Sequence, residues 1–249
     1  MFKYTRRVTR PYVRALQSGY RGLRRSIRDD LPPGLSHSAD RFLEHFDLVM
    51  VDHGVFRLLY SNRHRVGAKV LRSAQPAPHD IARLARRGIR TIVNLRGDRD
   101  CGSYRLEKAA CDRHGIRLVD FPAKSREAPP RAFFHDAKRL FASIEYPMLM
   151  HCKSGADRAG LMSVLYLILH EERPTEEALR HLSLYYGHIR HAATGILDAI
   201  FAAYIEHNRR IPIAFLDWID AFYDPKQLKA NFATRTWGDV LLDGVLRRE

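Results

Sequence analysis

The sequence predicts an α/β fold with a mostly parallel central sheet flanked by helices. Four short apolar segments have the length and composition of buried strands, and longer helical patterns separate them. Strands that alternate with helices in this way form a mostly parallel sheet with helices on both faces. The predicted strands are 69–72, 91–95, 116–121 and 148–150, and the helices between them are 79–87, 104–114 and 131–144.

The predicted domain extends over 40–210 and is preceded by a basic arm. Residues 1–28 contain nine Lys and Arg residues and no acidic one, although the whole chain has 42 basic and 28 acidic residues. Apolar residues recur between the arginines at helical spacing, which predicts an amphipathic helix able to lie on an anionic membrane surface. A helix folded back on the domain and a disordered basic tail are the alternatives. Residues 29–39 are interpreted as a linker.

The part of the chain after 170 is also expected to be helical. The patterns over 175–186 and 192–207 predict two helices that close the domain. Residues 211–249 are rich in aromatic side chains and predict a C-terminal extension of one or two amphipathic helices. We expect this extension to pack against the domain, and a partner or membrane surface is the alternative.

The composition limits the kinds of site that the chain can hold. Three cysteines without paired spacing argue against a disulfide framework and a zinc site, and they indicate a reducing compartment. His181, His188 and His191 have no partners that complete a metal set, so we expect exposed helix histidines. No apolar run has the length of a membrane span. The protein is therefore expected to be cytoplasmic, either free or peripheral on a membrane, without a metal, a cofactor or a nucleic-acid partner.

The chemistry of the chain is concentrated in residues 151–160, with the sequence HCKSGADRAG. Cys152 stands six residues before Arg158, between a strand-like run and a helix-like run. A tight loop that leads from a strand into a helix N-terminus presents backbone N–H groups to an anion. Cys111 has the same spacing to Arg117, but there a helix leads into a strand. Cys111 is therefore interpreted as structural.

The residue types in this loop suit phosphoryl transfer. A helix N-terminus and a nearby guanidinium favour the thiolate of Cys152, which is the nucleophilic form. Gly155 and Gly160 let the backbone approach a ligand closely, and Arg158 can hold two phosphate oxygens at once. His151 is expected to order the loop through its ring N–H. The pattern predicts a cysteine-dependent phosphatase, and the other expected phosphate contacts are Lys153, Ser154, Ala156 and Ala159.

The loop resembles the signature of the protein tyrosine and dual-specificity phosphatase superfamily, HC-x5-R followed by a small or hydroxyl residue and Gly. It is also similar to the HC-x-x-G-x-DR variant of myotubularins and of secreted bacterial phosphatases that accept phosphoinositides. Residues 71–76 and 88–96 resemble the opening of bacterial and fungal dual-specificity-like phosphatases. The resemblance implies the cysteine-based phosphatase fold and a cysteinyl-phosphate intermediate. Ala159 departs from the Ser or Thr of many members, which implies slower turnover of that intermediate.

The family pattern leaves the general acid open. Most members supply an Asp from a loop upstream of the cysteine, and the corresponding residues 121–130 contain none. Asp157 is predicted to protonate the leaving oxygen, and the alternative is a carboxylate that caps the helix. Asp120 and Glu127 are the fallback acids. Arg126 is expected to contact the substrate.

Two arginines outside the loop are expected to have a structural role. Arg72 and Arg96 are interpreted as buried pairing residues rather than substrate contacts.

The favoured function is hydrolysis of phosphotyrosine in proteins, or of phosphate on lipid or inositol headgroups. A pseudo-phosphatase that only binds phosphoryl groups stays open because of Ala159 and the absent upstream Asp. A rhodanese-like sulfurtransferase is a third class, although its cysteine loop is usually shorter.

Overall fold

The computed structural model describes residues 61–233. The predicted arm (1–28), the linker (29–39), the first part of the predicted domain and residues 234–249 lie outside the described residues. None of the helices in the described part is long and apolar enough to cross a bilayer.

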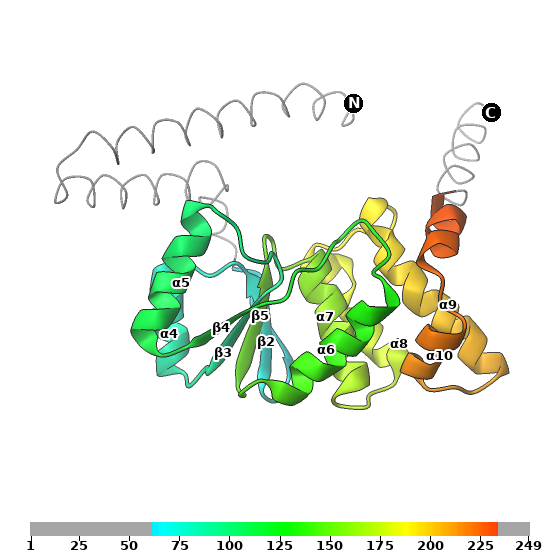
Figure 1. Ribbon diagram of the computed structural model, residues 1–249, viewed down its shortest axis with the longest axis horizontal. Helices are drawn as coiled ribbons and strands as arrows, with labels where there is room; N and C mark the ends of the chain where they lie inside the picture. The colour runs from blue at the N-terminus through cyan, green and yellow to red at the C-terminus, as the bar shows by residue number, and fades with distance from the viewer. Residues whose placement is uncertain (1–60, 234–249) are drawn as a thin grey trace, which may run out of the picture.

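A five-stranded sheet forms the centre of the described region, in the order β1-β2-β5-β3-β4 (Figure 1). Its strands are β1 (His64–Gly67), β2 (Val70–Ala74), β3 (Thr91–Asn94), β4 (Arg117–Asp120) and β5 (Met148–Cys152). Strand β1 pairs antiparallel with β2, and the other three pairings are parallel. The mostly parallel sheet is confirmed, and the four predicted strands agree within two residues. Strand β1 was not predicted, because the sequence HRVG has no apolar run.

Helices cover both faces of the sheet, as the alternating pattern predicted. On one face lie α4 (Pro78–Arg86) and α5 (Gly102–His114), and on the other lie α6 (Arg131–Ser143) and α7 (Asp157–Leu169) (Figure 1). Each face has its own apolar cluster, and the larger one contains most of α7. Cys111 is fully buried in the smaller cluster, which agrees with its expected structural role.

The predicted single helix over 175–186 is wrong. The chain forms a short helix, α8 (Thr175–Ala178), and then two separate 3₁₀ turns, Leu179–His181 and Leu184–Tyr186. The backbone is extended at Ser183 and left-handed at Gly187, so a continuous helix cannot form. The segment instead folds over the start of α7, where Leu182 and His181 contact Gly160.

The residues after 190 return to regular helix and pack on the helices that cover the α6 and α7 face of the sheet (Figure 1). Helix α9 (Ile196–Arg210) begins four residues later than predicted, after a 3₁₀ turn at Ala193–Gly195. Helix α10 (Phe215–Ala221) packs against α6, and residues 225–233 are again helical. Phe215 and Trp218 are buried in the larger cluster. The Tyr223 hydroxyl also donates to Pro129 O over 2.8 Å. Helix α10 and Tyr223 are therefore part of the apolar core, and Leu228 and Phe232 pack against its edge.

Candidate active site

The Cys152 loop lies at the carboxyl edge of the parallel strands. Cys152 is the last residue of β5, residues 153–156 form the loop, and Asp157 is the first residue of α7. In the register of the sheet, Cys152 lies beside Ala74 of β2. Ligands of parallel α/β sheets bind at this edge, where a helix N-terminus faces the end of a strand. The strand, loop and helix order predicted for this segment is confirmed.

Two glycines allow the loop to fit against its neighbours. Gly155 has φ +74°, and a Cβ there would lie 2.6 Å from Ala74 N. A Cβ at Gly160 would lie 2.8 Å from Leu182 Cδ2 and 2.9 Å from the His181 carbonyl oxygen. The close approach at both glycines is therefore to the protein itself, since each Cβ would collide with protein atoms.

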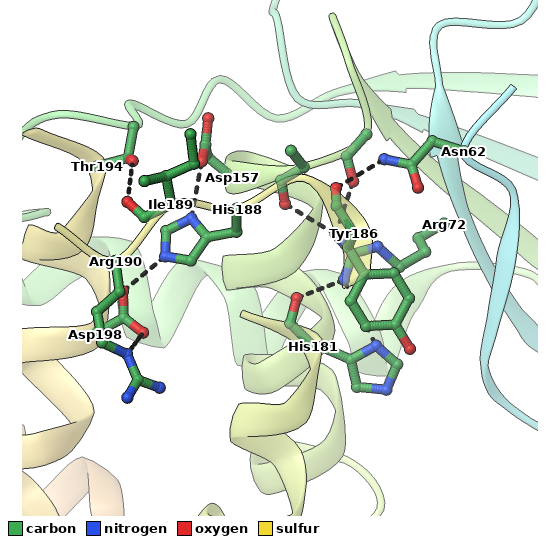
Figure 2. A network of polar contacts seen from close by, with 12 residues as sticks. Asn62, Arg72, Asp157, His181, Tyr186, His188, Ile189, Arg190, Thr194 and Asp198 are labelled. Atoms are coloured by element: carbon green, nitrogen blue, oxygen red, sulfur yellow. Dashed lines mark hydrogen bonds and ion pairs between the residues drawn. The ribbon is translucent and has the colours of Figure 1, made fainter. Parts of the chain in front are cut away.

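A buried arginine holds the outer side of the loop. Arg72 has no exposed surface, and its Nη2 donates to the carbonyl oxygens of Gly155 (2.6 Å) and Ala156 (2.8 Å). Its Nη1 donates to His181 O over 2.6 Å, and its guanidinium lies 4.2 Å from the ring centre of Tyr186 (Figure 2). In a trans peptide the C=O and N–H groups point in opposite directions. Carbonyls directed at Arg72 therefore leave the following N–H groups pointing away from it.

Asn62 links the loop to the segment that folds over it. Its Nδ2 donates to Ser154 O over 2.9 Å and to Tyr186 O over 3.0 Å (Figure 2). Asn62 is buried and has φ +43°, a left-handed conformation that asparagine tolerates better than most residues. Sequence reasoning missed this residue, because it stands 92 positions before Ser154.

The predicted phosphate contacts differ in exposure. Lys153 and Arg158 are half-buried, and Ser154 is exposed, so their side chains lie at the surface of the loop. Arg158 Nη1 donates to Leu95 O over 3.4 Å, which places the guanidinium beside the end of β3. Ala159 and Gly160 are buried within the first turn of α7.

His151 is connected to α5 through a buried acidic residue. Its Nε2 lies 2.6 Å from Glu107 Oε1, and neither side chain has exposed surface. Glu107 Oε2 accepts from Gln75 Nε2 over 2.7 Å, and Arg96 donates to the amide oxygen of Gln75. Arg72 and Arg96 thus both contact protein groups, but only Arg72 is buried, so the predicted burial is wrong for Arg96. The contact of His151 is with α5 rather than with the Cys152 loop, so the ordering of the loop through the ring N–H of His151 stays a prediction.

The three candidate acids have different surroundings. Asp120 ends β4, and its carboxylate accepts from Asn94 Nδ2 (2.7 Å) and from the Tyr104 hydroxyl (2.6 Å). Glu127 is exposed, and its hydrogen bond and ion pair with Lys124 lower the pKa of Glu127. Arg126, next to it, is also exposed. Asp157 is the candidate that lies in the Cys152 loop segment itself.

His188 is buried against Asp157, contrary to the expected exposed helix histidine. Its Nδ1 lies 2.8 Å from Asp157 Oδ1, and its Nε2 lies 2.6 Å from Asp198 Oδ2 (Figure 2). His181 is also buried, and burial together with the charge of Arg72 lowers the pKa of His181 to about 4. His191 is exposed, but it lies in a turn rather than in a helix. Within 61–233, no cluster of three or more potential metal ligands is present.

A family model described as "DSP-PTPase phosphatase fused to NAD+ Kinase" matches residues 59–194, more than half of the chain. The chain belongs to this dual-specificity phosphatase family. The similarity of the loop and of residues 71–76 and 88–96, noted in the sequence, falls inside the matched range.

Curated relatives and solved structures are also similar to the chain. The dual specificity protein phosphatase TpbA of Pseudomonas aeruginosa strain UCBPP-PA14 is 28% identical over 122 residues, which cover 49% of this chain and 53% of the relative. TpbA of strain PAO1 is 27% identical over the same length. The chain therefore spans about half the length of the curated relatives that it matches.

Among solved structures, P. aeruginosa TpbA has a TM-score of 0.45 and 21% identity, and the match covers 70% of this chain and 91% of that chain. PTPMT1 in complex with PI(5)P has a TM-score of 0.41 and 20% identity, with 59% and 98% coverage.

Proposed function

We propose that this member of the dual-specificity phosphatase family is a metal-independent phosphomonoesterase with Cys152 as its nucleophile. The observation that carries the proposal is the position of Cys152 at the end of β5, facing the first turn of α7 across a loop fixed by Arg72. Backbone N–H groups at a helix N-terminus stabilise both a thiolate and a bound phosphate. Arg158 supplies the bidentate contact to two phosphate oxygens.

The reaction proceeds in two steps. The Cys152 thiolate attacks phosphorus, the S–P bond forms, and the P–O bond to the leaving group breaks while Asp157 gives that oxygen its proton. Water then attacks the phosphorus of the cysteinyl-phosphate, Asp157 takes a proton from the water, and the S–P bond breaks to release the thiolate and inorganic phosphate. Arg158 and the loop N–H groups stabilise the charge on the phosphoryl oxygens in both steps.

Release of phosphate from p-nitrophenyl phosphate tests the proposal. We expect the wild-type protein to release phosphate in the presence of a chelator, and Cys152→Ser to lose at least about a thousandfold in kcat, since it lacks the nucleophile. Cys111→Ser, at a cysteine with the same spacing to an arginine, is the matched control and should keep its activity.

The two alternative classes give different results in the same experiment. Binding of phosphate by the wild type without any turnover would identify a pseudo-phosphatase. Sulfur transfer from thiosulfate to cyanide, with no phosphate released, would identify a sulfurtransferase.

For the substrate we propose a phosphotyrosine side chain or a phosphorylated lipid or inositol headgroup. The curated relatives are named dual specificity protein phosphatases, which favours a phosphorylated side chain of a protein. The basic residues 1–28 favour a headgroup in an anionic membrane. A panel of phosphotyrosine peptides, phosphoserine peptides and phosphoinositides in liposomes, with and without residues 1–28, separates the two. Equal rates on peptides and lipids that do not depend on residues 1–28 would remove the reason to favour a membrane-bound substrate.

A further inference from the structure

His188 bridges two carboxylates that come from different helices. Its ring lies between Asp157, the first residue of α7, and Asp198 in α9, at 2.8 Å and 2.6 Å (Figure 2). The imidazole has no exposed surface, whereas the Asp157 side chain is 26% exposed. Asp157 is therefore the more exposed of the two carboxyl groups, since Asp198 is 11% exposed, and it stands five residues after Cys152 at the start of α7.

The two contacts determine the charge of the imidazole. A neutral imidazole carries one N–H, so only the imidazolium can donate to both carboxylates. Burial by itself lowers the pKa of His188, but the hydrogen bonds and charges of Asp157 and Asp198 outweigh it and raise the pKa to about 9. Arg190 Nε donates to Asp198 Oδ1 over 3.1 Å. Asp198 thus accepts from two cationic groups, His188 and Arg190.

The backbone around His188 is held by the same contacts that hold the loop. Asn62 connects Tyr186 O to Ser154 O, and Gly187 turns the chain with φ +79°. On the far side, Thr194 Oγ1 donates to Ile189 O over 3.2 Å. The ring of His188 therefore has a fixed position relative to the first turn of α7.

We infer that His188 is a positioning residue that holds the Asp157 carboxyl group in place for proton transfer at the Cys152 loop. The inference rests on the proposed phosphatase function, in which Asp157 exchanges protons with the leaving oxygen and with water. His188 occupies Oδ1 of Asp157, which leaves Oδ2 as the oxygen for the reacting group. A catalytic group that is fixed by a buried neighbour keeps its reactive orientation between turnovers.

The dependence of the rate on the leaving group tests this role. An alkyl leaving group needs a proton far more than p-nitrophenolate does, so loss of a positioned acid is selective for alkyl substrates. We expect His188→Ala to reduce kcat by about ten- to a hundredfold on an alkyl phosphate and by less than about threefold on p-nitrophenyl phosphate. KM should change little. His188→Asn, which keeps an amide N–H near the position of Nδ1, should recover part of the loss.

A double variant shows whether His188 acts through Asp157. If it does, the double variant Asp157→Asn/His188→Ala should show the same leaving-group dependence as Asp157→Asn alone. Once the acid at position 157 is gone, loss of His188 cannot reduce proton transfer any further. His191→Ala, at an exposed histidine of the same segment, is the matched control and should behave as wild type. Equal losses on both substrates, or additive losses in the double variant, would assign His188 a structural role only.

A titration of the wild-type protein keeps the inference testable if the variants do not fold. The imidazole resonances of His188, followed by NMR, should show a doubly protonated ring up to about pH 8, in line with a pKa of about 9. Titration near the ordinary value of about 6.5 would contradict the bridging geometry. An inactive wild type with a high-pH His188 titration would remove the proposed function, whereas an active wild type with an unselective His188→Ala would remove only the positioning role.

Discussion

Gly155 shows how a single residue sets the conformation of the Cys152 loop. Its φ of +74° is unfavourable for any residue with a Cβ, and its position against β2 leaves no space for one. Gly88 has a similar φ of +81°, but a Cβ there would have nothing within 4 Å. Substitution of Gly88 thus measures the cost of the backbone conformation alone, whereas substitution of Gly155 adds the steric collision with β2.

We expect Gly155→Ala to lower the free energy of unfolding by about 2 to 5 kcal/mol, from the left-handed backbone and the collision with Ala74 together. Gly88→Ala should lower it by about 1 to 2 kcal/mol, from the backbone term alone. Urea denaturation of both variants measures the difference, and kcat on p-nitrophenyl phosphate should fall only in Gly155→Ala. Equal effects of the two substitutions would show that the loop can move away from β2.

Site residues that are close together in the sequence could be predicted, whereas those that are distant could not. Cys152, Arg158 and Asp157 stand within six positions of one another, so a local motif was enough to group them. Asn62 and His188 reach the same loop from 92 and 31 positions away. Such contacts depend on how the chain folds back on itself, and a single sequence carries no local signal for them. The histidine was assigned to an exposed helix face for this reason.

At the scale of elements, Arg72 connects three segments that are distant in the sequence. From strand β2 it bonds to the Cys152 loop and to the 3₁₀ turn Leu179–His181, and it lies against Tyr186. A planar guanidinium carries its donors on separate nitrogens and can serve these carbonyls at once, whereas an ammonium group donates from a single atom.

Arg72→Lys should therefore lower the free energy of unfolding by about 2 to 4 kcal/mol, because buried carbonyls lose donors and a buried charge loses partners. Activity should fall further than stability explains, since the loop is no longer held. Arg83→Lys, at an exposed arginine that pairs with Asp80, is the control and should change stability by less than about 0.5 kcal/mol. A native-like melting temperature and rate for Arg72→Lys would contradict this role.

The secondary structure was predicted well where the pattern was local and poorly where packing decided it. Buried strands such as β3 and β5 contain short apolar runs, Ile92 and Val93 in one and residues 148–150 in the other, so their positions followed from the sequence. Strand β1 is polar because it lies at the edge of the sheet. The break in 175–186 arises because Leu182 turns toward α7 while Leu184 is 76% exposed, a division that a helical apolar pattern does not reveal.

At the scale of the whole molecule, two buried histidines with pKa shifts in opposite directions make the free energy of unfolding depend on pH. The pKa of His188 is raised to about 9, so its contribution is complete below about 6.5 and is lost as the pH rises through 9. The pKa of His181 is lowered to about 4, so its contribution is complete above about 6.5 and is lost as the pH falls through 4. The two histidines together favour a maximum near pH 6.5.

Each histidine should change the free energy of unfolding by at most about 3.4 kcal/mol, because its pKa differs by about 2.5 units from the ordinary value and each unit corresponds to 1.36 kcal/mol. Urea denaturation between pH 4.5 and 9 measures the curve. His188→Asn should flatten its alkaline side and leave the acid side unchanged, and His181→Asn should do the reverse. A wild-type stability that stays constant from pH 6.5 to 9 would contradict the charged state of His188.

The tie between Asn62 and Ser154 has a practical consequence for shortened versions of the protein. The side-chain amide of Asn62, which precedes β1, holds the Cys152 loop through Ser154 O. An active fragment therefore cannot start at β2, where the parallel part of the sheet begins. A fragment that begins at Val70 would keep every residue of the HCKSGADRAG motif but would lose the hydrogen bonds of Asn62 to Ser154 O and Tyr186 O. Truncation for crystallisation or fusion should therefore leave Asn62 and β1 intact.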